Sequence, residues 1–339
     1  MFLSASTLDD LMMAVLQRLL RVRKSISTNR GDTKELTGVL LMLRNPRARL
    51  SRSTTKGTVF SCIGELLWYL SRSNELDLIK YYLPQYEKES DNGKTIYGAY
   101  GPRLFEWRRQ NQKRLNQVEN IIEVLKKHPS SRRAVIQLFD CLDLHGKRKS
   151  EIPCTCNLQF MVRNRRLHML TFMRSNDAYK GLPHDVFAFT MLQEIVARTL
   201  GIEIGTYKHA VGSLHLYDSD VQKAKRYLDE GWQSTTPMPP MPPGDPWLSI
   251  NEVLHAERTI RTGSINKIDL KMPGYWGDLV RLLAIFYFSK TSQKSQIRAV
   301  KRLMASKIFA TYINQREIKL QPPTTPEQLE IPFSTTSEK

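Results

Sequence analysis

Residues 156–175 read "CNLQFMVRNRRLHMLTFMRS", and their pattern gives the clearest indication of the fold. Its two apolar-rich runs, 156–164 and 166–175, alternate with period two, which is typical of strands with one buried face. The polar residues between them predict a hairpin turn. Strand-like runs at 38–43, 134–140 and 206–217 predict that this hairpin belongs to a larger sheet.

Helical periodicity predicts helices around these strands, at residues 7–23, 59–72, 103–127, 186–200 and 218–231. The segment 235–246, "TTPMPPMPPGDP", holds too much proline for a helix or a regular strand. Two further helices, near 276–289 and 292–315, follow it. This order predicts an α+β fold with a C-terminal helical appendage.

The chain divides into five expected segments. The first is an N-terminal helix within 1–26, with its N-cap near Thr7. An α+β domain over 27–235 would carry the chemistry, and a proline-rich linker over 236–246 would join it to a helical region over 247–320. The polar residues 321–339 are expected to form a flexible tail.

The composition favours an anionic partner, because the net charge is +18, from 51 Lys and Arg against 33 Asp and Glu. No zinc-finger or RNP aromatic motif is present, so nucleic acid is not the expected partner. Asp9 and Asp10 stand directly ahead of the apolar run that begins at Leu11, unlike in a signal peptide. The apolar run 279–288 contains an Arg and is too short to span a bilayer. We therefore expect a cytoplasmic protein with no membrane association.

Cys154 and Cys156 form a C-x-C pair, but no second Cys or His pair follows at zinc spacing. A metal site is therefore not expected. Each cysteine is then either a buried structural thiol or a nucleophile. "IPCTC" (152–156) puts Cys154 at the entrance of a predicted strand, and a cysteine nucleophile needs a nearby cation. If the two hairpin strands pair, Arg174 and its neighbour Ser175 would lie close to Cys154 and to a bound anion.

Two other motifs fit the same kind of ligand. Arg132 and Arg133, in "SSRR" (130–133), suit bidentate phosphate contacts. His215 and Tyr217, in "VGSLHLY" (211–217), share one face of a strand and could bind one hydroxyl. Taken singly, these residues could be surface charge or packing. Together with Cys154 they indicate a phosphate, a sugar hydroxyl and an electrophilic ring that sulfur attacks.

Asp185, in "GLPHDVFAF" (181–189), has two interpretations. Asp is a favoured N-cap, and the apolar run that follows has helical periodicity and ends at Gly201. Alternatively, the carboxyl group belongs to the site that Cys154 and Arg174 would form, and it contacts the ligand. Local sequence alone leaves both open.

Seven motifs resemble, in the same order, those of the thymidylate synthases and their pyrimidine hydroxymethylase relatives. The resemblance covers about residues 27–232. The motifs are "TNRGDTKELTG" (28–38), "STTKGTVFSCIGELLWYL" (53–70), "IYGAYGPRL" (96–104), "SSRRAVI" (130–136), "IPCTCNLQF" (152–160), "RSNDAYKGLPHD" (174–185) and "GSLHLYDSD" (212–220).

The resemblance implies a mixed β-sheet with surrounding helices, a homodimer, and a nucleoside monophosphate substrate. Cys154 would attack C6 of the pyrimidine, and C5 would then capture the one-carbon unit of 5,10-methylenetetrahydrofolate. The implied site residues are Arg30, Arg174 and Ser175 for the phosphate, Arg132 and Arg133 from the partner subunit for the same phosphate, His215 and Tyr217 for the sugar, Asn176 and Asp185 for the substrate, Glu65 and Tyr97 for water and proton transfer, and Asp177, Lys180, Gly181 and His184 for the folate.

Asp185 departs from thymidylate synthase proper, which has Asn there. Uracil presents an N3–H donor and an O4 acceptor, whereas cytosine presents an N3 acceptor and an amino donor. A protonated carboxyl group, or a carboxylate facing an N3-protonated ring, matches cytosine. The change resembles the cytidylate hydroxymethylases.

The folate region also departs from the synthases. Lys180 and His184 replace apolar residues, and "YYLPQYEKES" (81–90) stands in place of paired tryptophans. Easier access of water would favour a hydroxymethyl product over a methyl product. We therefore predict a CMP or dCMP 5-hydroxymethylase. The alternatives are a thymidylate-synthase-like C5 methylase and a non-catalytic nucleotide- or RNA-binding homologue.

Overall fold

A six-stranded mixed sheet organises the computed structural model, which describes residues 1–51, 58–107, 114–147, 149–231 and 236–319. The strand order is β1-β2-β6-β5-β4-β3, in which β1 with β2 and β5 with β6 are parallel and the other neighbours are antiparallel. The predicted α+β class is confirmed. The strands are β1 (Phe2–Ala5), β2 (Thr33–Leu43), β3 (Val135–Gln137), β4 (Thr155–Arg163), β5 (Arg166–Asp177) and β6 (Glu203–Tyr217).

The hairpin predicted from 156–175 is the β4–β5 pair, and its register joins Arg163 to Arg166. Asn164 and Arg165 form the two-residue turn with φ of 50° and 56°. Two left-handed residues in succession match the turn type that follows the right-handed twist of paired strands. The hairpin prediction is therefore confirmed, whereas strand β1, which pairs with Leu40–Leu43 of β2, has no counterpart among the sequence predictions.

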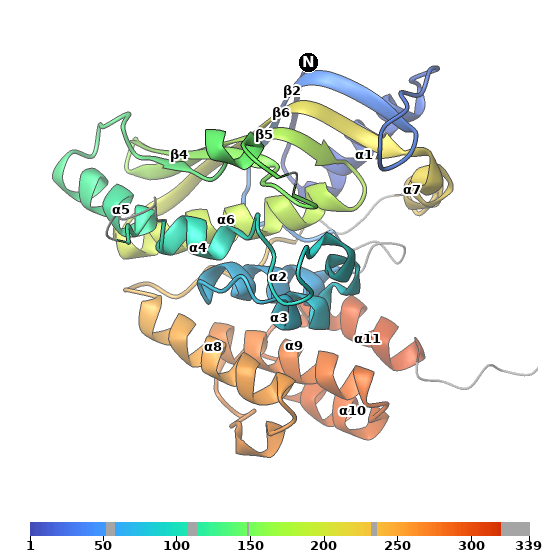
Figure 1. Ribbon diagram of the computed structural model, residues 1–339. Helices are drawn as coiled ribbons and strands as arrows, with labels where there is room; N and C mark the ends of the chain where they lie inside the picture. The colour runs from blue at the N-terminus through green and yellow to red at the C-terminus, as the bar shows by residue number, and fades with distance from the viewer. Residues whose placement is uncertain (52–57, 108–113, 148, 232–235, 320–339) are drawn as a thin grey trace, which may run out of the picture.

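One face of the sheet is covered by helices. In Figure 1 the sheet forms the upper layer, α6 runs beneath it, and α2 lies below α6. Buried side chains on β4 and β5, such as Phe160 and Met169, point to this covered face. Alternate positions on the other face are more exposed, and Phe172 is 40% exposed. The helices are α1 (Leu8–Leu20), α2 (Val59–Leu70), α3 (Leu76–Tyr82), α4 (Tyr100–Phe105), α5 (Gln117–Lys127), α6 (Gly181–Thr199), α7 (Val221–Asp229), α8 (Trp247–Arg261), α9 (Gly274–Lys290), α10 (Lys294–Arg302) and α11 (Ala310–Lys319).

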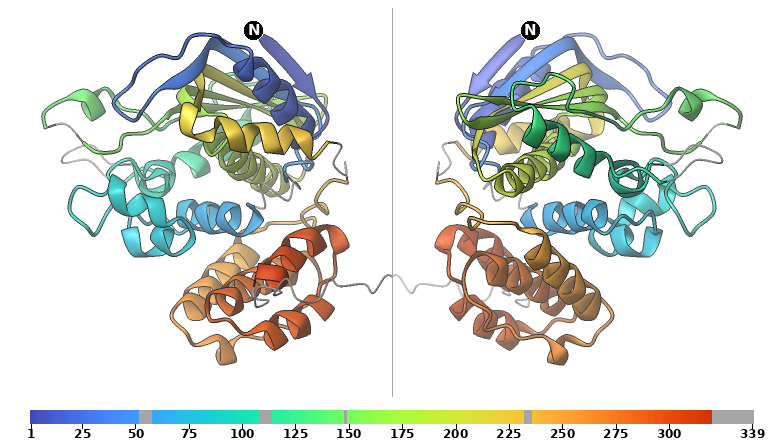
Figure 2. Two further views of the ribbon diagram at one scale, coloured as in Figure 1. Left: turned by 90° about the vertical axis from the view of Figure 1, so that its right-hand side faces the viewer. Right: turned by 90° about the vertical axis from the view of Figure 1, so that its left-hand side faces the viewer.

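The C-terminal helices α8 to α11 form the lowest layer (Figure 2). Helix α9 packs on α2, where Phe286 stacks on Phe60 with ring centroids 5.9 Å apart. The prolines of 236–246 lie outside helices and strands, but the segment is packed: the amide of Met238 donates to the Arg47 carbonyl oxygen, and Met238 is buried. These helices therefore share one continuous apolar core with the sheet region.

Two long helices expected from the sequence are interrupted. The 103–127 prediction is wrong as a single helix, because α4 ends at Phe105 and Trp107 pairs with Leu115 in an antiparallel bridge. Asn116 then caps α5 by accepting from the Glu119 amide. The 292–315 prediction fails for a similar reason. The carboxylate of Asp278 accepts from the amides of residues 305 and 306, which holds the chain in a turn between α10 and α11.

Other boundaries differ less. Thr7 caps α1 as expected, with its hydroxyl accepting from the Asp10 amide. The helix expected at 218–231 opens as a 3₁₀ turn at Asp218–Asp220 and continues as α7. The sequence patterns do not predict helices α3 and α8. The expected tail at 321–339 lies outside the described residues. No helix in the described part of the chain has the length and apolar character to cross a bilayer.

Candidate active site

Cys154 lies immediately before β4, and Arg174 of β5 lies beside it. The Arg174 amide donates to the Cys154 carbonyl oxygen at 2.8 Å, which fixes the two backbones. The Arg174 guanidinium donates from Nη2 to the Cys154 sulfur at 3.6 Å and from Nε to the Pro153 carbonyl oxygen at 3.0 Å. The expected Cys–Arg proximity is therefore present. Burial raises the pKa of the Cys154 thiol to about 11, and the positive charge of Arg174 opposes this rise.

Asp185 is not a helix cap. Helix α6 begins at Gly181, so Asp185 lies in its second turn, and the N-cap interpretation is wrong. The earlier start has a local cause: Asp177 Oδ1 accepts from the amides of Tyr179 and Lys180 and turns the chain into the helix. Asp185 is only 9% exposed. Burial raises the pKa of its carboxyl group to about 8, and the nearby Glu65 adds to the rise.

A buried chain of hydrogen bonds orients Asp185. Asn176 Nδ2 donates to Asp185 Oδ2 at 2.7 Å, and Asn176 Oδ1 lies 3.0 Å from His209 Nε2. Burial lowers the pKa of His209 to about 3, so the ring is neutral. Because an amide oxygen only accepts, His209 carries its proton on Nε2, and Nδ1 accepts from the Tyr207 hydroxyl at 2.7 Å. These hydrogen bonds hold Asn176 with its amide nitrogen toward Asp185 and its amide oxygen toward His209.

Glu65 of α2 is buried beside this group. Its Oε1 accepts from the hydroxyls of Tyr69 at 2.8 Å and Tyr86 at 3.2 Å. Tyr100 completes this side of the site: its hydroxyl accepts from the Thr155 amide at 3.1 Å. Tyr100 also lies within electrostatic range of Cys154 and Asp185, and burial raises its pKa well above the usual value.

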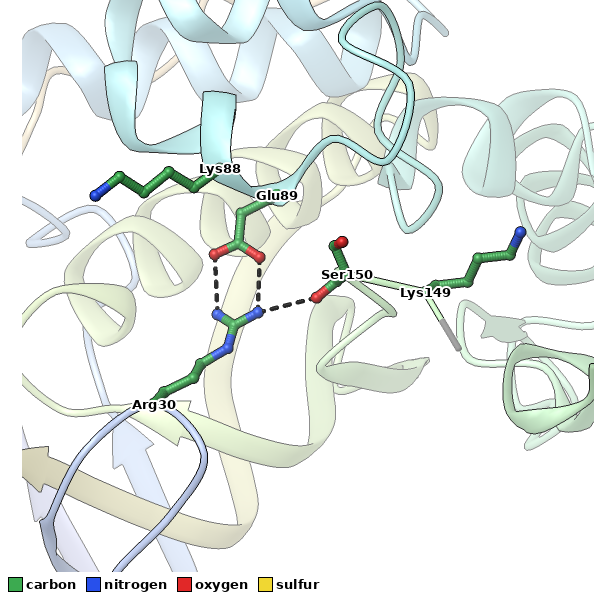
Figure 3. A pocket seen from close by; sticks show the side chains of 5 residues that line it. All are labelled: Arg30, Lys88, Glu89, Lys149 and Ser150. Carbon is green, nitrogen blue, oxygen red and sulfur yellow. Dashed lines mark hydrogen bonds and ion pairs between the residues drawn. The ribbon is translucent and has the colours of Figure 1, made fainter. Parts of the chain in front are cut away.

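Arg30, on the loop before β2, is held at the mouth of the site. It makes a bidentate ion pair with Glu89, at 3.0 and 2.6 Å, and Nη2 also donates to the Ser150 carbonyl oxygen at 3.1 Å (Figure 3). These residues line an open depression of about 550 Å³ together with Lys88 and Lys149. Two lysines and an arginine here make the depression suitable for an anion.

His215 and Tyr217 lie side by side on β6, as expected. Their rings meet edge to face, with centroids 5.1 Å apart. Tyr217 is within electrostatic range of both Arg30 and Cys154. The structure therefore gathers Arg30, Cys154, Arg174 and Tyr217 from four separate segments of the chain.

Four further candidates differ in their exposure and contacts. Tyr97 is 40% exposed, and its ring packs against Arg103 at 5.4 Å and Lys149 at 5.0 Å. Arg132 and Arg133 are exposed just before the edge strand β3. Ser175 is half-buried and pairs with Ser213 in the sheet.

The residues expected to bind folate are adjacent to Asp185. Lys180 pairs with Asp220 at 2.5 Å, and His184 Nε2 lies 2.9 Å from the Ser61 hydroxyl. Gly181 has a packing role, because a Cβ there would lie 2.9 Å from Asn176 Nδ2. It therefore lets the start of α6 approach Asn176 of β5.

Sequence reasoning missed Tyr100 and Glu151. Tyr100 is three residues after Tyr97 in the same motif, and its sequence context alone does not distinguish the two tyrosines. Glu151 directly precedes "IPC", where a charged residue at a strand entrance was the only signal. Its carboxylate is within electrostatic range of Cys154.

These features define a class: an α+β protein that holds a half-buried cysteine beside arginines and near a buried acid–amide pair, suited to thiol addition to an anionic ligand. A family model for thymidylate synthase matches residues 10–253. The chain belongs to the thymidylate synthase family. A thymidylate synthase of Buchnera aphidicola subsp. Baizongia pistaciae (strain Bp) is 27% identical over 177 residues, which is 52% of this chain and 66% of that relative. The match thus spans just under two thirds of the relative's length.

Proposed function

We propose that this protein is a cytidylate 5-hydroxymethylase, acting on CMP or dCMP. Asp185 carries the proposal. It is buried, and its pKa near 8 keeps it largely protonated at neutral pH. Asn176 donates to its Oδ2, so Oδ2 is the accepting oxygen and the proton belongs on Oδ1. One donor and one acceptor side by side match N3 and the amino group of cytosine, whereas uracil needs the reverse.

In this proposal Cys154 adds to C6 of the ring, which makes C5 a carbon nucleophile. The buried thiol has a raised pKa, so Arg174 and the phosphate-binding cations would assist its ionisation when substrate binds. Arg30, Arg174 and Ser175 would hold the phosphate. Arg30 would exchange Glu89 for phosphate oxygens, since both present paired anionic oxygens.

The same arrangement also supplies groups that would bind the sugar and groups that would transfer protons. His215 and Tyr217 would bind the sugar hydroxyl from their shared face of β6. Glu65 would organise water and proton transfer with Tyr69 and Tyr86, which already donate to it. The resemblance implies Tyr97 for this role, and Tyr100 is a second candidate, because its hydroxyl is within electrostatic range of both Cys154 and Asp185.

The site is compatible with 5,10-methylenetetrahydrofolate, which would supply the one-carbon unit. Asp177 Oδ1 accepts two backbone amides, and this leaves Oδ2 to accept from the amino and ring N–H groups of a pterin. Lys180, Gly181 and His184 would line the same region. Lys180 and His184 have protein partners in Asp220 and Ser61, so the wall beside the pterin would be polar. Such a wall favours water over hydride as the final nucleophile.

A homodimer is part of the proposal. Phe172 and Val135, 40% and 44% exposed, lie on the sheet face that none of the described helices covers, and a second copy would cover them. Arg132 and Arg133 would then reach the partner's phosphate. Mixing two inactive variants, Cys154→Ser and Arg133→Ala, should restore about a quarter of the activity if subunits exchange and sites are shared. No recovery after verified exchange would refute sharing. We also propose a cytoplasmic location, where such nucleotides and folates occur.

The central test uses C5-tritiated dCMP, CMP and dUMP with methylenetetrahydrofolate, and it measures tritium release together with product mass. We expect release from a cytidylate and a product heavier by a hydroxymethyl group. Release from dUMP alone would refute the base assignment, and a methyl product would favour a C5 methylase. Binding of nucleotide without release from any substrate would favour a non-catalytic nucleotide- or RNA-binding protein.

A further inference from the structure

Glu151 has an unusual environment beside Cys154. It lies three residues before the cysteine, on the segment that enters β4. Its Oε2 is buried, and none of the described residues gives it a hydrogen bond. Leaving a buried carboxylate oxygen unpaired costs free energy, so such an atom indicates a partner that is not part of the folded chain, such as water or substrate.

Gly98 provides the space for this carboxylate. A Cβ on residue 98 would lie 2.0 Å from Glu151 Oε2 and 2.9 Å from its Cδ. No side chain could be tolerated there without displacing the carboxyl group. The absence of a side chain at Gly98 therefore leaves the room in which the Glu151 carboxyl group lies.

The other carboxyl groups near the cysteine are already engaged. Glu65 accepts two tyrosine hydroxyls, and Asp185 accepts from the Asn176 amide. Glu151 and Asp185 are the two acids that act electrostatically on Cys154. Of these two, Glu151 has the buried oxygen still able to accept a proton from a bound molecule.

We propose that Glu151 is the general base for water addition in the hydroxymethylation, an inference that rests on the proposed function. Once the one-carbon unit stands on C5 as an exocyclic methylene, water attacks that carbon and forms a C–O bond. Glu151 Oε2 takes the proton of the water, and the electron pair of the C=C bond moves into the ring. The pair then forms C5=C6 and breaks the C6–S bond. The departing sulfur of Cys154 takes the proton from Glu151, which regenerates the carboxylate without any redox change.

The charge environment suits this role. Burial raises the pKa of Glu151 to about 7, Glu89 raises it further, and three arginines oppose the rise. A base whose pKa lies near the working pH is half ionised and still a useful acceptor. The thiol of Cys154, with its pKa near 11, is the stronger base of the two, so return of the proton to sulfur is downhill. The charged and titratable groups that face Glu151 are Glu89, Arg30, Arg103, Arg174, Cys154, Tyr86 and Tyr100.

Glu151→Gln in the full chain tests the assignment, because it keeps the shape and removes the base. Single-turnover reactions, with enzyme in excess over C5-tritiated cytidylate and methylenetetrahydrofolate, would follow three quantities. We expect tritium release within about threefold of the wild type and hydroxymethyl product slower by about 100-fold, the usual scale for one general base. Intact-protein mass should show an accumulating covalent protein–nucleotide adduct that carries the extra carbon.

Matched variants sharpen the result. Gly98→Ala should reproduce the same split between tritium release and product, and combining it with Glu151→Gln should add little. Glu87→Gln, an exposed carboxylate paired with Lys80, should behave like the wild type. In the wild type, product formation should rise through a midpoint near pH 7, and Glu151→Gln should lack this rise.

Equal loss of tritium release and product in Glu151→Gln would overturn the proposal, because the residue would then act before the methylene forms or only on structure. Unchanged product formation would overturn it as well. A wild type that releases no tritium from any cytidylate would instead refute the proposed function itself. The two failures are therefore distinguishable in one set of reactions.

Discussion

Raising the pH from 7 to 9 should weaken the binding of CMP or dCMP about tenfold. The pair between Asp185 and cytosine holds one shared proton, whether that proton sits on the carboxyl oxygen or on N3 of the ring. Free protein that has lost this proton must take one up in order to bind. The affinity therefore depends on the protonated fraction of Asp185 before binding.

The magnitude follows from the pKa of about 8 that burial gives this carboxyl group. About nine tenths of the molecules are protonated at pH 7 and about one tenth at pH 9. The ratio is about tenfold, or about 1.4 kcal/mol of binding free energy. The affinity should fall about twofold from pH 7 to 8 and about fivefold from pH 8 to 9, because the protonated binding form predominates below the raised pKa and is lost above it. The nucleotide phosphate, with its second pKa near 6, is already ionised over this range.

Isothermal titration calorimetry at pH 6, 7, 8 and 9 would measure the dissociation constant at fixed ionic strength. Repeating the titration in buffers of different ionisation enthalpy counts the proton taken up, which should approach one at pH 9. Asp185→Asn is the matched control, because an amide does not titrate and its affinity should not follow the pH.

Glu151 also titrates in this range, with its pKa near 7, so the series should be repeated in Glu151→Gln. The fall above pH 8 should persist there. A level affinity from pH 7 to 9 in the wild type, or the same slope in Asp185→Asn, would refute the role of the Asp185 proton.

Three further variants test the chemistry, the orientation and the stability of the site. Cys154→Ser should abolish tritium release and change the nucleotide dissociation constant by less than about threefold; measurable turnover would rule out the thiol as nucleophile. His209→Phe removes the donor that holds the Asn176 amide, so the preference for CMP over UMP should fall about tenfold in competition binding, the scale of one hydrogen bond. An unchanged preference would show that Asn176 is held by other means. Glu194→Ala leaves the buried guanidinium of Arg49 unpaired and should lower the free energy of unfolding by about 3–5 kcal/mol in urea titration. A loss below about 1 kcal/mol would mean that solvent reaches Arg49.

Much of the fold was predictable because the signals were local. Period-two alternation and two polar residues sufficed for the β4–β5 hairpin, and Thr7 followed by Asp10 sufficed for the start of α1. The long helices failed where a distant group redirected the chain. The carboxylate of Asp278 accepts a hydrogen bond from the amide of Ala305, 27 residues further along the chain, and this bond holds the turn between α10 and α11. No window around residues 303–309 contains that partner.

The candidate site, like the fold, could be predicted in part. The chemical types of the site could be predicted from sequence: a cysteine at a strand entrance, an arginine near the end of the paired strand, and a His-x-Tyr on one strand face. Strand pairing brings the first two near each other, and the register shift between Thr155 and Asn157 then places Cys154 beside Arg174.

The environments of the acidic residues, by contrast, depend on contacts between distant parts of the chain. Asp185 resembles a cap in the sequence because a cap is a local property, but its burial, its pKa and its bond to Asn176 depend on Glu65 and His209 from other elements. The sequence pattern gave almost no indication of Glu151, because the burial of its carboxyl oxygen depends on Gly98, which is distant along the chain. Protonation and desolvation depend on everything within several ångströms in space, whereas sequence patterns report neighbours along the chain.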